Sequence, residues 1–163
     1  MTGRFGFSID VPVRNDWRNV DLMRSSIQSC FTAVFRDLDG CHAMSMVTGE
    51  LLENAMKYGQ WGGGTEQVFR LRITGDASHA TIVVENPASR ASGHVDRLHQ
   101  SIEWIRSFAN PRDAYRARLR EIADQDANQS RQLGLVRVAY EGNGVLGAAF
   151  DGSIVTVTVE IDL

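Results

Sequence analysis

The last segment of the chain alternates strictly between apolar and polar side chains, and this pattern constrains the fold more than any other feature. The alternation predicts a strand at 153–161 with one buried and one open face. Its apolar positions are Val155, Val157, Val159 and Ile161, and its polar positions are Thr156, Thr158 and Glu160. Asp151-Gly152 predicts a two-residue hairpin turn that pairs this strand with another at 144–150. The pattern therefore predicts a sheet with one face covered by helices.

Three more strands are expected earlier in the chain. The segment 5–13 ends close to a proline, which is typical of an edge strand. The segments 66–74 and 79–86 flank Gly75-Asp76-Ala77-Ser78, a composition that predicts a second hairpin.

Apolar residues recur at helical spacing in 16–39 and 42–58, which predicts two amphipathic helices packed on the sheet. The stripe of the first helix consists of Val20, Met23, Ile27, Cys30, Phe31, Val34 and Leu38, and Asp39-Gly40 is expected to end it. Gly59 and the glycines at 62–64 are expected to end the second helix. A further helix is expected at 133–141.

Residues 87–131 form a long insertion with two further helical patterns. One is marked by Val95, Leu98, Ile102 and Ile105, and the other starts at the capping pair Asn110-Pro111. Trp104 and Tyr115 are expected to be packing residues. The whole order predicts one α+β domain over 1–163. We expect a two-layer α/β sandwich with a mixed, mostly antiparallel sheet, helices on one face and a helical lid insertion at 87–131.

The composition narrows the classes of function. The net charge of −3 gives no general attraction to nucleic acid or to an anionic membrane, and no apolar run approaches the ~20 residues that cross a bilayer. The arginines 112, 116, 118 and 120 are interpreted as a solvated helix face. Cys30 and Cys41 are expected to be buried or inert thiols, and His94 and His99 to be exposed on a surface helix. Together these points predict a cytoplasmic protein.

The segment Glu50-Leu51-Leu52-Glu53-Asn54-Ala55-Met56-Lys57-Tyr58 carries the most chemistry. On a helix, Glu50, Asn54 and Lys57 fall within an arc of roughly 60° beside the apolar stripe. An amide oxygen suits Mg²⁺, a carboxylate can deprotonate a hydroxyl, and an ammonium can bind phosphate. The alternative is an amphipathic surface helix in which a glutamate pairs with Lys57 along the helix.

This segment resembles the N box of the GHKL (Bergerat-fold) ATPases and kinases. The overall pattern is similar to small stand-alone bacterial regulators of the SiaB-like and anti-sigma-factor serine kinase type. The resemblance spans about residues 43–161. It implies that Asn54 holds Mg²⁺ through a bound nucleotide, that Glu50 is the catalytic carboxylate, and that Lys57 belongs to the ATP site.

Two further family motifs are present in altered form. The strand end Glu85-Asn86 occupies the adenine-reading position, where Pro87 and Ser89 replace the usual glycines. Leu133-Gly134 matches the start of the phosphate-binding helix, where Ser130 and Gln132 replace glycines and Arg131 offers a guanidinium fork. By resemblance, Glu85, Asn86, Arg131, Leu133 and Gly134 are cofactor-binding residues.

Three functions are compatible with these motifs. The first is a signalling regulator that binds Mg²⁺-ATP and acts as a serine/threonine kinase on a STAS-like anti-sigma-factor antagonist. The second is a nucleotide-free GHKL scaffold that docks a partner protein or forms a homodimer, because lost glycines obstruct backbone approach to a ligand. The third is an unrelated α+β enzyme in which the N-box match is coincidental.

Overall fold

The computed structural model describes residues 3–12, 17–35, 38–61, 68–76, 78–124 and 133–163. Within these residues, five strands form one sheet in the order β1-β2-β3-β5-β4, and every neighbouring pair is antiparallel. The strands are β1 (Phe5–Pro12), β2 (Val68–Gly75), β3 (His79–Pro87), β4 (Gly144–Phe150) and β5 (Ile154–Asp162). The predicted edge strand β1 lies at an edge, and the α+β sandwich is confirmed.

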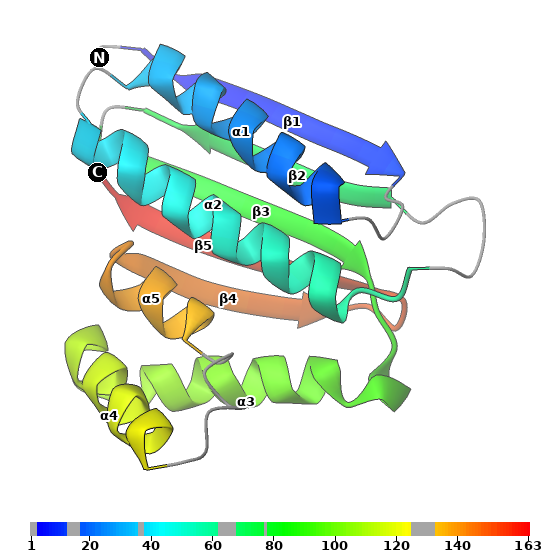
Figure 1. Cartoon of the computed structure of the whole chain (residues 1–163), viewed down its shortest axis with the longest axis vertical. Helices are drawn as coiled ribbons and strands as arrows, with labels where there is room; N and C mark the ends of the chain where they lie inside the picture. The colour runs from blue at the N-terminus through cyan, green and yellow to red at the C-terminus, as the bar shows by residue number, and fades with distance from the viewer. Residues whose placement is uncertain (1–2, 13–16, 36–37, 62–67, 77, 125–132) are drawn as a thin grey trace.

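The helices lie on one side of this sheet (Figure 1). They are α1 (Trp17–Val34), α2 (Leu38–Tyr58), the short 3₁₀ helix η1 (Arg90–Ser92), α3 (His94–Arg106), α4 (Pro111–Ala123) and α5 (Gly134–Tyr140). Figure 1 shows α1 and α2 running side by side over the sheet, with α3 and α4 of the insertion beyond β4. In the described part of the chain, no helix is both long and apolar enough to span a bilayer.

The core lies between α2 and the inward face of the sheet. Met44, Val47 and Leu51 of α2 are buried, and they belong to one cluster with inward residues of the strands such as Ile82 and Val159. The strands alternate between buried and more exposed positions, as the period of two requires. The outward positions of the sheet are mostly polar or small, so one face stays open.

Two features of the first helix differ from the prediction. Helix α1 ends at Val34, and Asp39 belongs to the first turn of α2, where its carboxylate complements the positive end of the helix dipole. The expectation that Asp39-Gly40 ends the first helix was therefore wrong. Cys30 is exposed although Cys41 is buried, because Cys30 lies roughly 60° around the helix from Ile27, at the rim of the buried stripe.

Both hairpins are present, and an aspartate organises each turn. The carboxylate of Asp76 accepts hydrogen bonds from the backbone N–H groups of Ser78 and His79, and these bonds lower its pKa. Asp151 does the same for Ser153 and Ile154. The Asp151 N–H donates to the Ile154 carbonyl, so Gly152, with φ of 108°, and Ser153 are the central turn residues. The second turn therefore falls one residue later than predicted.

Candidate functional site

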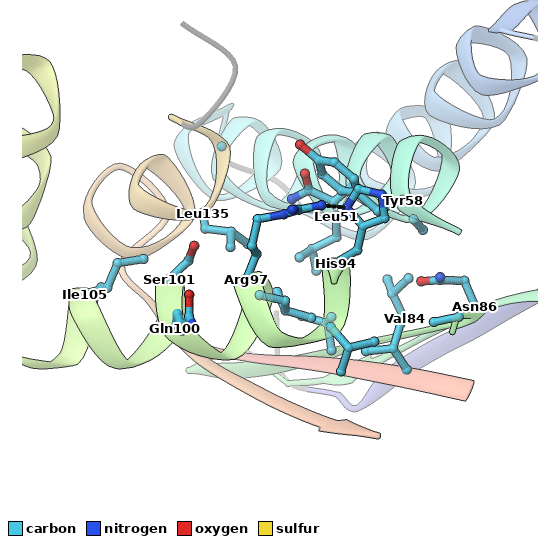
Figure 2. A pocket seen from close by; sticks show the side chains of 18 of the residues that line it. Leu51, Tyr58, Val84, Asn86, His94, Arg97, Gln100, Ser101, Ile105 and Leu135 are labelled. Atoms are coloured by element: carbon cyan, nitrogen blue, oxygen red, sulfur yellow. Dashed lines mark hydrogen bonds between the residues drawn. The ribbon is translucent and has the colours of Figure 1, made fainter. Parts of the chain in front are cut away.

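A cavity of about 460 Å³ lies between α2, the sheet and the helical insertion (Figure 2). This volume is within the range of roughly 300–1,000 Å³ that is typical of small-molecule sites. Its walls are mainly apolar, from residues such as Leu51, Val84 and Leu135, while Asn54, Asn86 and the polar face of α3 add hydrogen-bonding groups. Three segments that the motifs singled out therefore meet around one cavity: α2, the end of β3 and the start of α5.

Asn54 faces this cavity from α2 with an unsatisfied group. Its amide nitrogen is buried and has no hydrogen-bond partner among the described residues. A buried donor without a partner costs about 1–3 kcal/mol, so such groups are rare in native proteins unless ordered water or a ligand satisfies them. Asn54 therefore has the position and the unused bonding capacity that a ligand-binding residue needs.

The end of β3 places Asn86, and not Glu85, in the cavity. Successive residues of a strand face opposite sides of the sheet. Asn86 is only 3% exposed and lines the cavity, and its amide nitrogen donates to the Pro87 carbonyl at 3.0 Å. This bond leaves the carbonyl oxygen of Asn86 as an acceptor for a ligand.

Glu85 points to the open face of the sheet. Its carboxylate lies 3.6 Å from the Arg70 guanidinium on β2, and it does not line the cavity. Of the two residues predicted at this strand end, Asn86 therefore lies at the cavity and Glu85 does not.

Glu50 lies beside the cavity rather than in its wall. One carboxylate oxygen accepts a hydrogen bond from the Arg137 guanidinium at 2.6 Å. The other lies against Gly134, where an added Cβ would be 2.5 Å from it and 3.8 Å from the Asn54 amide nitrogen. Because residue 134 is a glycine, α5 can start close to the side chains of Glu50 and Asn54, which are neighbours on α2.

The remaining predicted residues are less central. Lys57 is exposed, does not line the cavity, and its ammonium lies 4.9 Å from the centre of the Tyr58 ring. Leu133 precedes α5 and also does not line the cavity. Arg131, Ser130 and Gln132 lie outside the described residues. A phosphate contact by Lys57 would require its side chain to move from this position.

Helices α3 and α4 of the insertion supply polar wall residues that sequence reasoning did not identify. These are His94, Arg97, Gln100 and Ser101 of α3 and Arg118 of α4. Arg118 stacks on Trp104, with its guanidinium carbon 4.2 Å from the ring centre, so Trp104 both packs and lines the cavity. The charged side chains among the described lining residues are thus Arg97 and Arg118, and Arg118 also pairs with Glu121 at 2.9 Å. Because no carboxylate lines the described wall, it favours an anionic ligand.

A periodic signal in the sequence could have found the α3 residues. His94, Arg97, Ser101 and Trp104 are spaced by three, four and three residues, which places them on one helix face. His94 was expected to be exposed, but it packs against Tyr58 of α2 with ring centres 4.9 Å apart. Burial, with help from Arg97 and Lys57, lowers the pKa of His94. The His94 ring therefore links the start of α3 to the end of α2.

Trp61 caps the C-terminal end of α2, the helix that carries Tyr58. The indole N–H of Trp61 donates to the carbonyls of Ala55 and Met56 at 3.2 and 3.1 Å, and the Gly59 N–H also donates to Ala55. A Cβ at residue 59 would lie 2.5 Å from that carbonyl oxygen. Gly59 therefore ends the helix as predicted, and the glycines at 62–64 lie outside the described residues.

Replacing Glu50 by glutamine is expected to raise the Tm near neutral pH. Burial raises the pKa of Glu50 more than the Arg137 charge lowers it. Because the folded-state pKa lies above the unfolded value, Glu50 contributes most stability below its unfolded pKa and loses it as pH rises through the folded pKa. The Tm difference should shrink as pH falls from about 7 to about 4. Thermal melts across this range test this, and a lower Tm for Glu50→Gln at about pH 7 would contradict it.

The fold and the cavity define a two-layer α+β domain with a small-molecule-sized site under a helical insertion. No protein-family model and no curated protein matches the sequence. A chain in the crystal structure of the SiaB–SiaC complex from Pseudomonas aeruginosa is similar in structure, with a TM-score of 0.69 and 14% sequence identity. The match covers 96% of this chain and 89% of that chain. This likeness shows a shared fold over nearly the whole domain.

Proposed function

We propose that this chain is a bacterial signalling regulator of the GHKL type that binds Mg²⁺-ATP in the cavity and phosphorylates a hydroxyl of a STAS-like partner protein. The observation that carries the proposal is the buried amide nitrogen of Asn54, which has no partner in the described part of the chain and faces a cavity that Asn86 and Gly134 also line. The structural neighbour comes from a complex with a second protein, which supports a role exercised through a protein partner.

The lining residues fit an anionic nucleotide. The apolar wall around Leu51 and Val84 suits a base, and the free carbonyl oxygen of Asn86 can accept a hydrogen bond from an amino group on it. Arg97 and Arg118 can balance phosphate charge. The described lining offers the amide of Asn54 but no carboxylate to a metal, so Mg²⁺ would be held mainly by the phosphates together with Asn54.

The chemistry of transfer would rest on positioning by this chain. Mg²⁺-ATP supplies the phosphoryl group and an activated leaving group. Asn54 would orient the phosphates, and Glu50 would accept the proton of the partner hydroxyl. The raised pKa of Glu50 suits this role, because a general base works best when its pKa is closer to the working pH.

A matched pair of adjacent substitutions tests the nucleotide site. Asn86→Leu leaves an amino group of the base unpaired, which should weaken Mg²⁺-ATP binding by about tenfold or more. Glu85→Gln changes the other face of the same strand and should leave the affinity unchanged. Isothermal titration calorimetry measures both. The absence of heat and of a thermal shift for the wild type at about millimolar nucleotide would refute ATP binding.

A nucleotide-free protein-binding module is the second candidate, and one observation favours it. The turn after β3 uses its backbone internally: the Pro87 carbonyl accepts from the Gln60 N–H, and the Ala88 N–H donates to the Ser153 carbonyl. These backbone groups of the turn are therefore already hydrogen-bonded within the protein and cannot bind a ligand. Nucleotide that copurifies with the native protein in a mass spectrum would count against this candidate.

A further inference from the structure

A chain of polar contacts joins the lid insertion to the N-box helix by way of α5. Arg137 of α5 donates from one guanidinium nitrogen to Glu50 at 2.6 Å and from another to Glu141 at 3.1 Å. Burial, together with the side chain of Glu141, raises the pKa of Tyr115 of α4. The Tyr115 ring also packs on Tyr140, with ring centres 5.1 Å apart. The Arg137 guanidinium thus joins α5 to α2, and the Tyr115–Tyr140 contact joins α4 to α5.

This contact holds one oxygen of the Glu50 carboxylate. Arg137 donates to that oxygen, and the other oxygen faces Gly134. The side chain of Glu50 is 19% exposed and that of Arg137 is 36% exposed, so the pair is partly shielded from water. A carboxylate held in this way has fewer rotamers to explore than a free surface glutamate.

We propose that Arg137 is a positioning residue that sets the orientation of Glu50 and makes it depend, through Glu141 and Tyr115, on the docking of lid helix α4. This inference rests on the proposed function, because it takes Glu50 as the base in phosphoryl transfer. Arg137 itself does not line the cavity, so it would act through Glu50 and not by touching the nucleotide.

The other charges near Glu50 do not offer the same link. They are Glu53 on α2, Arg24 on α1 and Glu141 on α5, and Arg24 is paired with Glu53 on the side of α2 that faces α1. Arg137 is distinctive because its rigid fork can contact two carboxylates at once, which the point charge of a lysine does less well. Arg24 therefore provides a matched control: it is an arginine of α1 that pairs with a glutamate of α2, as Arg137 does, but among the described residues it has no link to the lid.

The test compares Arg137→Met, Arg137→Lys, Tyr115→Phe and the control Arg24→Met in the full-length protein. For each variant, Mg²⁺-ATP affinity is measured by calorimetry. The kcat is measured as release of phosphate from ATP, a reaction in which water takes the place of the partner hydroxyl and Glu50 plays the same role. We expect Arg137→Met to lower kcat by about a hundredfold with affinity almost unchanged. Arg137→Lys should restore part of the rate, Tyr115→Phe should lower it less, and Arg24→Met should leave it unchanged.

A double-mutant cycle without nucleotide separates this inference from the proposed function. Glu50→Gln and Tyr115→Phe should change the denaturation midpoint non-additively, because both act through Arg137 and Glu141. Additive changes would overturn the link between the lid and Glu50. The positioning role would be overturned if Arg137→Met lowered the affinity for Mg²⁺-ATP and left kcat unchanged. It would also be overturned if Arg24→Met lowered kcat as much as Arg137→Met does. If the wild-type protein neither binds nor hydrolyses ATP, the proposed function is refuted. The double-mutant cycle would still show whether the lid is coupled to Glu50, because it is measured without nucleotide.

Discussion

Replacing Phe31 by alanine is expected to destabilise the protein by about 3–5 kcal/mol, the typical cost of removing a buried phenyl ring. Phe31 is completely buried. Its ring meets Phe7 of β1 at 5.6 Å edge to face and Phe35 at 6.0 Å. Phe35 in turn packs on Phe5 at 5.4 Å. Because β1 is an edge strand, this aromatic cluster contributes strongly to holding it against α1.

Leu22→Ala is the control for this prediction, because Leu22 lies on the same helix but is 67% exposed. It should change stability by about 0.5 kcal/mol or less. Urea denaturation followed by circular dichroism measures both variants. Since the free energy of unfolding of such domains is about 5–15 kcal/mol, Phe31→Ala should lose a large part of it. A loss below about 1 kcal/mol would show that Phe31 does not hold α1 on the sheet.

The architecture could be predicted from the sequence because its elements have strong periodic patterns. The alternation of Val155 to Ile161 gave the last strand to within one residue, and Asn110-Pro111 marked the start of α4, where the Asn110 side chain accepts from the Asp113 N–H. Local chemistry of this kind acts over a few residues and does not depend on the rest of the fold. The boundary between α1 and α2 was less certain, because Asp39 can follow one helix or start the next.

The candidate site could be predicted only in part. The N box located Asn54 and Glu50, because its residue types and spacing lie on one helix. The motif at the strand end predicts Glu85 and Asn86 together, but neighbouring residues of a strand face opposite sides of the sheet. Only Asn86 is buried and lines the cavity.

The insertion was the hardest part to interpret, because its role depends on tertiary packing. Arg118 was assigned to a solvated face from composition, but its side chain is only 16% exposed and lines the cavity. An arginine can stack on an aromatic ring even when its neighbours in the sequence are charged and exposed. Which arginine of the run 112–120 turns inward depends on how α4 docks on α3 and α5, and the sequence pattern does not specify this docking.

Replacing Asn54 by alanine is expected to weaken Mg²⁺-ATP binding by about 10- to 150-fold, which corresponds to the loss of one hydrogen bond to a charged group, about 1.5–3 kcal/mol. The same change should keep or raise the Tm. The amide nitrogen of Asn54 is buried and has no partner among the described residues, so truncation removes no hydrogen bond of the described structure. Alanine also favours the interior of a helix more than asparagine does.

Opposite effects on affinity and stability would identify Asn54 as a residue kept for binding, since a structural residue would lose stability when truncated. Glu53→Ala is the control, because its neighbouring side chain pairs with Arg24 on the surface and is 47% exposed. It should leave Mg²⁺-ATP affinity unchanged. Calorimetric titration and thermal melts of both variants check the prediction. Wild-type affinity in Asn54→Ala, or a clear fall in its Tm, would show that the buried amide serves the fold and not a bound nucleotide.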